Sequence, residues 1–217
     1  LYEKNVSTKG LLERIKTLCE GLTVPIIMKT MSTGFSNEDA HALWDLGVGA
    51  INSQGVGGVS FARIETVKTL SLAQKQNDPI KKRPFDFFGT PTVWSLLDLA
   101  LRPENAEIPL FIGGGIHDGR QAVKALALGA DVITIGYPVL IEIIEDFGYP
   151  DENNLDKWFE TFIHDMKMTM CLLGAKNIKE LREIVRNRAI IFGRTKQWIE
   201  QRNLKFPAIF TRKVFAS

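Results

Sequence analysis

The chain alternates short apolar runs with longer amphipathic patterns, and each apolar run leads toward a glycine-containing turn. The four runs cover residues 24–29, 48–51, 109–112 and 131–136. Between the runs, apolar residues recur at three- and four-residue steps, which predicts helices. Alternation of strands and helices is typical of parallel βαβ units. The sequence therefore predicts an α/β fold with four parallel strands. Helices are expected over residues 11–19, 36–47 (with Ser36 as N-cap), 61–73, 91–101, 120–128, 140–147, 155–173 and 177–185, and around Trp198.

Four such units form either a small open sheet or half of a closed barrel. An open sheet exposes two edges, which proteins usually blunt with charges, and these strands carry no edge charges. A half-barrel leaves the same edges to be closed by strands from elsewhere. Complete barrels of this class take ~250 residues, whereas these 217 residues supply four of eight units. We therefore expect residues 1–217 to form one domain, the C-terminal half of a (β/α)₈ TIM barrel followed by C-terminal helices. The N-terminal half is expected to be absent from this chain.

Composition excludes several classes of function. The net charge is +2, from 27 basic and 25 acidic residues, so no strong field attracts nucleic acid or anionic lipid. No apolar run is long enough to cross a membrane. Cys19 and Cys171 lie far apart within helical patterns, which favours buried free thiols in a reducing cytosol. We expect a cytoplasmic protein that binds neither nucleic acid nor membrane.

The strongest chemical signal is a pair of glycine turns that follow the last two predicted strands. The first turn covers residues 113–119 and the second covers residues 136–138. Glycines let backbone N–H groups approach an anion without interference from a Cβ atom. In (β/α)₈ barrels a phosphate commonly lies between the loops after the last two strands. One such turn alone would indicate only a tight connection, but two of them favour a phosphate site.

Residues 112–136 resemble the matching stretch of FMN-dependent barrel enzymes such as the α-hydroxy-acid oxidases. Other segments resemble, in the same order along the chain, the FMN- and Mg²⁺-dependent type 2 isopentenyl diphosphate isomerases. The segments that carry this second resemblance are residues 24–29, 34–36, 55–65, 88–96, 173–178 and 193–198. The resemblance is to the C-terminal part of that family.

The resemblance implies a set of cofactor-binding residues. Lys29 matches a lysine that contacts the flavin, where a cation stabilises the anionic reduced ring. The phosphate would be held by the two glycine turns. The implied FMN-binding residues are Lys29, Val59, Gly114, Gly115, Ile116, His117, Gly136 and Tyr137.

Several of these positions depart from the family pattern. His117 stands where the family has an arginine, so a bidentate phosphate donor becomes an imidazole. Val59 replaces a threonine and Gln54 replaces a serine. The other departures are Asn52 for aspartate, Thr30 for glutamate, Phe61 for tryptophan, and Gly136 with Tyr137 for alanine and leucine.

The resemblance further implies interconversion of isopentenyl and dimethylallyl diphosphate, with NADPH as reductant of the flavin and assembly as a homo-oligomer. The family's residues for substrate diphosphate, Mg²⁺ and proton transfer belong to its N-terminal half. No catalytic residue or metal ligand is therefore predicted in this chain. Two alternatives stay open: a non-catalytic or divergent flavin- or phosphate-binding subunit, and another FMN-dependent oxidoreductase of the α-hydroxy-acid oxidase type. The turn at residues 54–58 lacks the catalytic histidine of those oxidases, which weakens the second alternative.

Overall fold

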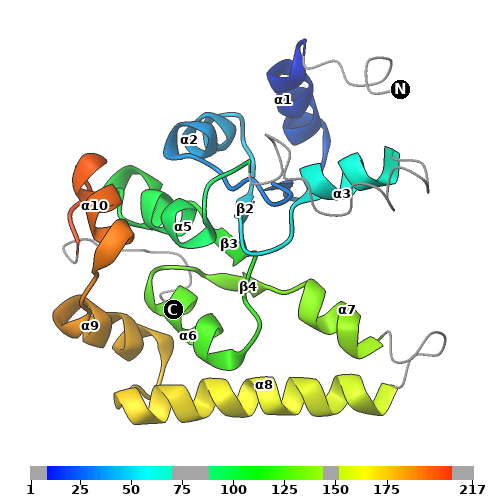
Figure 1. Ribbon diagram of the computed structural model, residues 1–217. Coiled ribbons are helices and arrows are strands. Elements are labelled where there is room, and N and C mark those ends of the chain that lie inside the picture. Colours follow the sequence, from blue (N-terminus) through cyan, green and yellow to red (C-terminus); the bar gives the residue numbers. More distant parts are fainter. Residues whose placement is uncertain (1–8, 70–87, 144–151, 207–217) are drawn as a thin grey trace.

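A computed structural model describes residues 9–69, 88–143 and 152–206. Within them lies a four-stranded parallel sheet in the order β1-β2-β3-β4 (Figure 1). Each strand thus pairs with the next strand along the chain, as in consecutive βα units. The strands are β1 (Ile27–Lys29), β2 (Ala50–Gln54), β3 (Leu110–Gly113) and β4 (Val132–Thr134).

Helices follow the strands at the predicted places. The expected helix over residues 61–73 is seen as far as Thr69. Residues 70–73 and 144–147 of the predicted helices lie outside the described residues. The helices are α1 (Leu11–Gly21), α2 (Asn37–Asp45), α3 (Phe61–Thr69), α5 (Thr92–Ala100), α6 (Gly119–Ala127), α7 (Tyr137–Ile143), α8 (Glu152–Leu173), α9 (Ile178–Arg188) and α10 (Gly193–Gln201), with a 3₁₀ turn η2 (Pro103–Asn105).

The predicted N-cap of α2 is confirmed. The Ser36 hydroxyl accepts a hydrogen bond from the backbone N–H of Asp39 at 3.1 Å, which satisfies one of the free donors of the first turn. Asp118 caps α6 in the same way, through the N–H of Gln121 at 2.8 Å. Gly129, just beyond α6, has a φ of 111°, a left-handed conformation that favours glycine.

Strand β2 is longer at its carboxyl end than the apolar run at residues 48–51 predicts. It continues through three polar residues to Gln54. Ser53 is buried because its hydroxyl accepts the N–H of Phe35 at 2.9 Å and contacts the hydroxyl of Ser95 at 2.7 Å. A polar side chain with such partners can occupy the interior of a strand. The strand therefore reaches the glycine-rich turn that begins at Gly55.

One face of the sheet is covered by helices. Met28, Ile51 and Leu110 are aligned across β1, β2 and β3, so their side chains lie on the same face. Ile51, Leu110 and Ile112 are completely buried in the main core. Ile15 of α1, Ala40 and Leu43 of α2, Leu96 and Leu99 of α5, Ala122 and Ala125 of α6, and Phe162 of α8 belong to the same cluster.

The opposite face is only partly covered by the described residues. Lys29, Asn52, Phe111 and Val132 form one row across the strands, and Gln54, Gly113 and Thr134 form the next. Ile27, in the same face of β1, is 46% exposed. In a closed (β/α)₈ barrel this face is the interior, where side chains from alternate strands form layers.

Helix α8 packs closely against α6 along the lower edge of Figure 1. A Cβ atom built on Gly119 would overlap the backbone of α8 at Phe162 and Met166. The main chain at the start of α6 therefore lies in direct contact with the main chain in the middle of α8.

The prediction that both cysteines are buried is only partly correct. Both cysteines are free, but Cys19 is half-buried and Cys171 is exposed, so the prediction of buried thiols is wrong for Cys171. It lies near the end of α8, beside Leu172, which is 84% exposed.

Among the helices that the structure describes, none combines the length and apolar composition that a membrane crossing requires.

Candidate functional site

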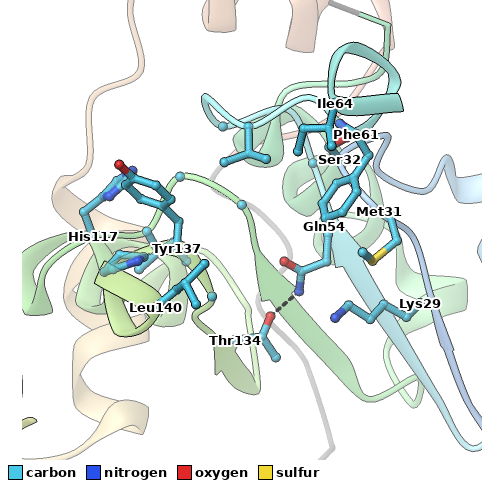
Figure 2. A pocket seen from close by; sticks show the side chains of 18 residues that line it. Lys29, Met31, Ser32, Gln54, Phe61, Ile64, His117, Thr134, Tyr137 and Leu140 are labelled. Carbon is cyan, nitrogen blue, oxygen red and sulfur yellow. Dashed lines mark hydrogen bonds between the residues drawn. The ribbon is translucent and has the colours of Figure 1, made fainter. Parts of the chain in front are cut away.

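A pocket of about 560 Å³ lies at the carboxyl ends of the four strands (Figure 2). Residues that end or follow each strand contribute to its wall, which is the usual place for a site in barrels of parallel strands. The pocket-lining residues are Lys29, Met31, Ser32, Gln54, Gly55, Gly57, Val59, Phe61, Ile64, Gly114, Gly115, Ile116, His117, Thr134, Gly136, Tyr137, Pro138 and Leu140.

The loops after β2 and β3 touch main chain to main chain. A Cβ atom on Gly57 would overlap the backbone of Gly114 and Gly115. Gly114 and Gly115 have φ angles of 92° and 78°, which other residues rarely adopt. The glycines at these positions are therefore required by both close approach and backbone conformation.

The glycine loops offer backbone donors that no other group uses. The N–H groups of Gly115, Ile116 and Gly136 donate no hydrogen bond within the described part of the chain, and all three residues line the pocket. Unpaired backbone N–H groups on neighbouring loops offer donors to an anion. A Cβ atom on Gly136 would meet nothing within 4 Å, so the space in front of this residue is open.

The first turn of α6 is not the main source of donors for this anion site. Its N-cap, Asp118, lies outside the pocket lining. Burial acts to raise the pKa of the Asp118 carboxyl, but hydrogen bonds from the Gln121 N–H and the Arg120 side chain outweigh it and lower that pKa. A carboxylate thus neutralises part of the helix's positive end, and the loop N–H groups remain as the main donors.

His117 and Tyr137 bring the loops after β3 and β4 together at one end of the pocket (Figure 2). Their rings meet edge to face with centroids 6.3 Å apart. The His117 N–H donates to Oε1 of Gln121 at 2.7 Å, which fixes the backbone while the ring stays exposed. The two glycine turns therefore face one space, as the sequence predicts.

The other end of the pocket combines one cation with an apolar rim. Lys29, exposed at the end of β1, lies there with Met31 beside it (Figure 2). Several exposed apolar side chains surround the opening, an arrangement that favours a ligand with a flat apolar part. At this end they include Met31, Phe61 and Ile64, whereas Tyr137 and Leu140 are exposed beside His117 at the other end (Figure 2).

All eight residues predicted from the sequence to bind the cofactor line this pocket: Lys29, Val59, Gly114, Gly115, Ile116, His117, Gly136 and Tyr137. Their roles toward a cofactor stay a prediction. Sequence reasoning missed Met31, Ser32, Thr134 and Leu140. Thr134 ends β4 and Met31 follows β1 by two residues, so position relative to strand ends is the signal that could have identified them.

Residues 2–187 match the family model described as FMN-dependent dehydrogenase. The chain belongs to the FMN-dependent dehydrogenase family. The matched residues include all four strands of the chain and all the pocket-lining residues.

Comparison with curated proteins shows which enzymes this chain of the FMN-dependent dehydrogenase family is similar to. An isopentenyl-diphosphate delta-isomerase of Methanothermobacter thermautotrophicus is 32% identical over 201 residues, covering 93% of this chain and 52% of the relative. The isomerase of Synechococcus is 35% identical over 169 residues, covering 76% of this chain and 44% of the relative. These relatives confirm the resemblance to isopentenyl diphosphate isomerases. The chain spans about half the length of the curated relatives it matches.

Solved structures confirm the fold class. A lactate oxidase of Pediococcus acidilactici matches with a TM-score of 0.57 and 23% identity, covering 82% of this chain and 40% of that chain. A mandelate oxidase matches with the same TM-score and 18% identity, covering 79% and 39%. At identities this low, the comparison shows that this chain shares the fold of the two oxidases, and it shows nothing further. Both matches cover less than half of the solved chain, as expected for part of a (β/α)₈ barrel.

Proposed function

We propose that this chain supplies the FMN-phosphate site and one wall of the flavin pocket in an FMN-dependent isomerase of isopentenyl diphosphate. The observation that carries the proposal is the convergence of two glycine loops, with unpaired N–H groups, on one end of a pocket that has Lys29 at the other. The isomerase relatives supply the substrate class.

The residues at the phosphate end fit the terminal group of FMN. The N–H groups of Gly115, Ile116 and Gly136 provide donors without intervening side chains. The ring of His117 would add a further donor. A phosphate monoester has several acceptor oxygens and a charge near −2 at neutral pH, so this set of donors suits it.

The residues at the opposite end fit the ring system of a flavin. Apolar side chains such as Met31 and Phe61 would contact the flat ring, while Lys29 would place a positive charge beside its polar edge. Such a charge favours the reduced anionic form of the flavin. In the described part of the chain, the pocket lining contains no acidic residue, and its basic residues are Lys29 and His117. Because they lie at opposite ends, we assign them separate tasks.

When bound, reduced FMN would supply the acid–base chemistry that moves a proton at the allylic carbon without net oxidation. In this chain, the glycine loops would fix the position of the cofactor and the apolar rim would exclude water from the ring. Lys29 would hold the charge of the reduced state. We assign no proton-transfer residue to the described part of the chain.

The rest of the active site would come from the other half of the barrel. Among the described residues, no group of three or more His, Cys, Asp or Glu side chains could hold a metal ion. We propose that the Mg²⁺ ligands and the substrate-diphosphate residues lie on the four strands that pair with the two edges of this sheet and close the barrel. We further propose a cytoplasmic homo-oligomer that uses NADPH to reduce the flavin.

The first experiment measures flavin binding by purified protein that contains residues 1–217. Absorbance bands near ~370 and ~450 nm after addition of FMN and gel filtration are expected for a bound flavin. Protein that retains no flavin under these conditions contradicts the proposal and favours a non-catalytic subunit.

A second experiment distinguishes the two flavin enzymes. The protein is reduced with NADPH and supplied with Mg²⁺ and isopentenyl diphosphate, and formation of dimethylallyl diphosphate is measured. In parallel, lactate and mandelate are supplied with oxygen. Isomerisation without consumption of hydroxy acid is expected, and oxidation of a hydroxy acid without isomerisation would contradict the assignment.

A further inference from the structure

The side chain of Gln54 occupies the space that a side chain at position 113 would need. Gln54 on β2 is aligned with Gly113 on β3, and Gly113 is aligned with Thr134 on β4. A Cβ atom on Gly113 would overlap both the amide of Gln54 and the hydroxyl of Thr134. Because Gly113 has no side chain, Gln54 can reach across it and donate a hydrogen bond to Thr134.

Two hydrogen bonds accompany the orientation that the Gln54 amide has in the structure. Its Nε2 donates to Oδ1 of Asn52 at 2.7 Å and also to Oγ1 of Thr134. With Asn52 oriented as it is in the structure, the reversed orientation would place the Gln54 carbonyl oxygen against the carbonyl oxygen of Asn52, two acceptors without a proton between them. Asn52 is buried, with 8% of its surface exposed. Both N–H groups of the Gln54 amide are thus used inside the protein.

The carbonyl oxygen of Gln54 is left for a ligand. Oε1 receives no hydrogen bond from the part of the chain that the structure describes, and Gln54 lines the pocket. Thr134 accepts from Gln54, which leaves its own hydroxyl proton available. The pair therefore offers one acceptor and one donor side by side, a combination that matches an alcohol group.

The place of this pair along the pocket identifies the part of the ligand that it meets. Figure 2 shows Gln54 and Thr134 between the His117–Tyr137 end and the end formed by Lys29 and Met31. If the phosphate of FMN lies at the first end and its ring at the second, the ribityl chain with its hydroxyl groups lies between them. Resting on the proposed FMN site, we propose that Gln54 and Thr134, supported by Asn52 and made possible by Gly113, bind the ribityl hydroxyl groups.

The test compares FMN with analogues that lack one ribityl hydroxyl. Dissociation constants for FMN and for 2′-, 3′- and 4′-deoxy-FMN are measured with the unaltered protein and with Gln54→Leu and Thr134→Val. Loss of one hydrogen bond is expected to weaken FMN binding by about tenfold in Gln54→Leu. For one of the deoxy analogues the substitution should make no difference, because the partner hydroxyl is already missing.

A purely structural bridge between β2 and β4 predicts a different result. Gln54→Leu would then lower thermal stability and change the affinities for FMN and all three analogues by the same factor, which would overturn the assignment. Equal FMN affinity in Gln54→Leu and the unaltered protein would also overturn it, while leaving the flavin site in place. If the unaltered protein binds no FMN, the proposed function itself fails and this assignment fails with it.

The shared space between positions 54 and 113 is tested separately, by thermal stability. Gly113→Ser should destabilise the protein that contains Gln54, because the new side chain meets the amide. In a background that carries both Gln54→Ser and Thr134→Ala, the same change should have much less effect, because both overlapping groups are gone. Stability losses that simply add in the combined variant would contradict the coupling of position 113 to these two side chains.

Discussion

The rings of His117 and Tyr137 meet edge to face, with centroids 6.3 Å apart, although they come from loops after different strands. This contact places an imidazole at the proposed phosphate end of the pocket, where the family resemblance implies an arginine. A guanidinium offers a phosphate a charged, bidentate set of donors that an imidazole does not have.

The first prediction is therefore that His117→Arg binds FMN more tightly than the unaltered protein at neutral pH. An additional charge-assisted hydrogen bond to the phosphate would strengthen binding by about tenfold. Fluorescence titration of FMN measures both affinities, and equal affinities would exclude position 117 as a phosphate ligand.

The second prediction concerns Lys29. Replacing this cation with a neutral side chain of similar length, in Lys29→Gln, should make the bound flavin harder to reduce. A tenfold change in the equilibrium for two-electron reduction corresponds to ~30 mV, and we expect a fall of about this size. The reduction potential of the bound FMN is measured by dye-linked titration.

The control for Lys29 is Lys124→Gln, which removes a lysine on α6 that lies outside the pocket lining. Its bound flavin should keep the potential of the unaltered protein. Equal potentials in Lys29→Gln and in the control would show that Lys29 does not act on the ring.

The third prediction tests the close approach of the two loops at Gly57. In Gly57→Ala the new methyl group would overlap the backbone of Gly114 and Gly115, so the loop after β3 must move. We expect a loss of ~1–3 kcal/mol in stability, as for other overpacked sites, together with at least tenfold weaker FMN binding.

Gly21→Ala is the matched control for Gly57→Ala. A Cβ atom at Gly21 meets nothing within 4 Å, and alanine is a better helix former than glycine. Its stability should be unchanged or higher, and FMN affinity should be unchanged. If both alanine variants behave alike in thermal unfolding, the contact between the two loops does not constrain the site.

The sequence predicts the pocket well where glycines carry the information. Turns such as Gly113–Gly115 and Gly136 are recognisable because few other structures require glycines directly after an apolar run. Lys29 is identified through the family resemblance, and its place at the carboxyl end of a predicted strand agrees with the usual position of sites in such barrels. The four strands and most helix positions follow from periodicity alone.

The remaining features depend on how strands are aligned, which no local pattern specifies. The contact of Gln54 with Thr134 across Gly113 requires the register of three strands. The hydrophobicity pattern does not predict the polar end of β2, because the hydrogen-bond partners that allow Ser53 to be buried come from distant parts of the chain. Apolar residues such as Met31 are common in cores, so their place in a pocket rim is visible only in the structure.

The last prediction concerns a buried carboxylate that fixes the final helix. Asp98 on α5 is 3% exposed and accepts hydrogen bonds from Arg202, just after α10, at 2.6 Å and from Arg102 at 3.2 Å. The hydrogen bond to Asp98 raises the pKa of the Arg202 guanidinium. Asp98 also accepts the N–H of Asn37 at the start of α2, so one side chain connects three helical segments.

Asp98→Ala should lower the free energy of unfolding by about 2–3 kcal/mol, because two guanidinium groups and one backbone N–H lose a charged partner. Lys196→Ala is the control, since Lys196 contacts Glu200 at 4.0 Å and both side chains are 63% exposed. Exposed pairs of this kind contribute roughly 0–1 kcal/mol. Urea unfolding of both variants measures the difference. Similar losses in the two would mean that water replaces Asp98 as the partner of Arg202, and that α10 is held by its apolar contacts, such as the stacked rings of Trp94 and Trp198.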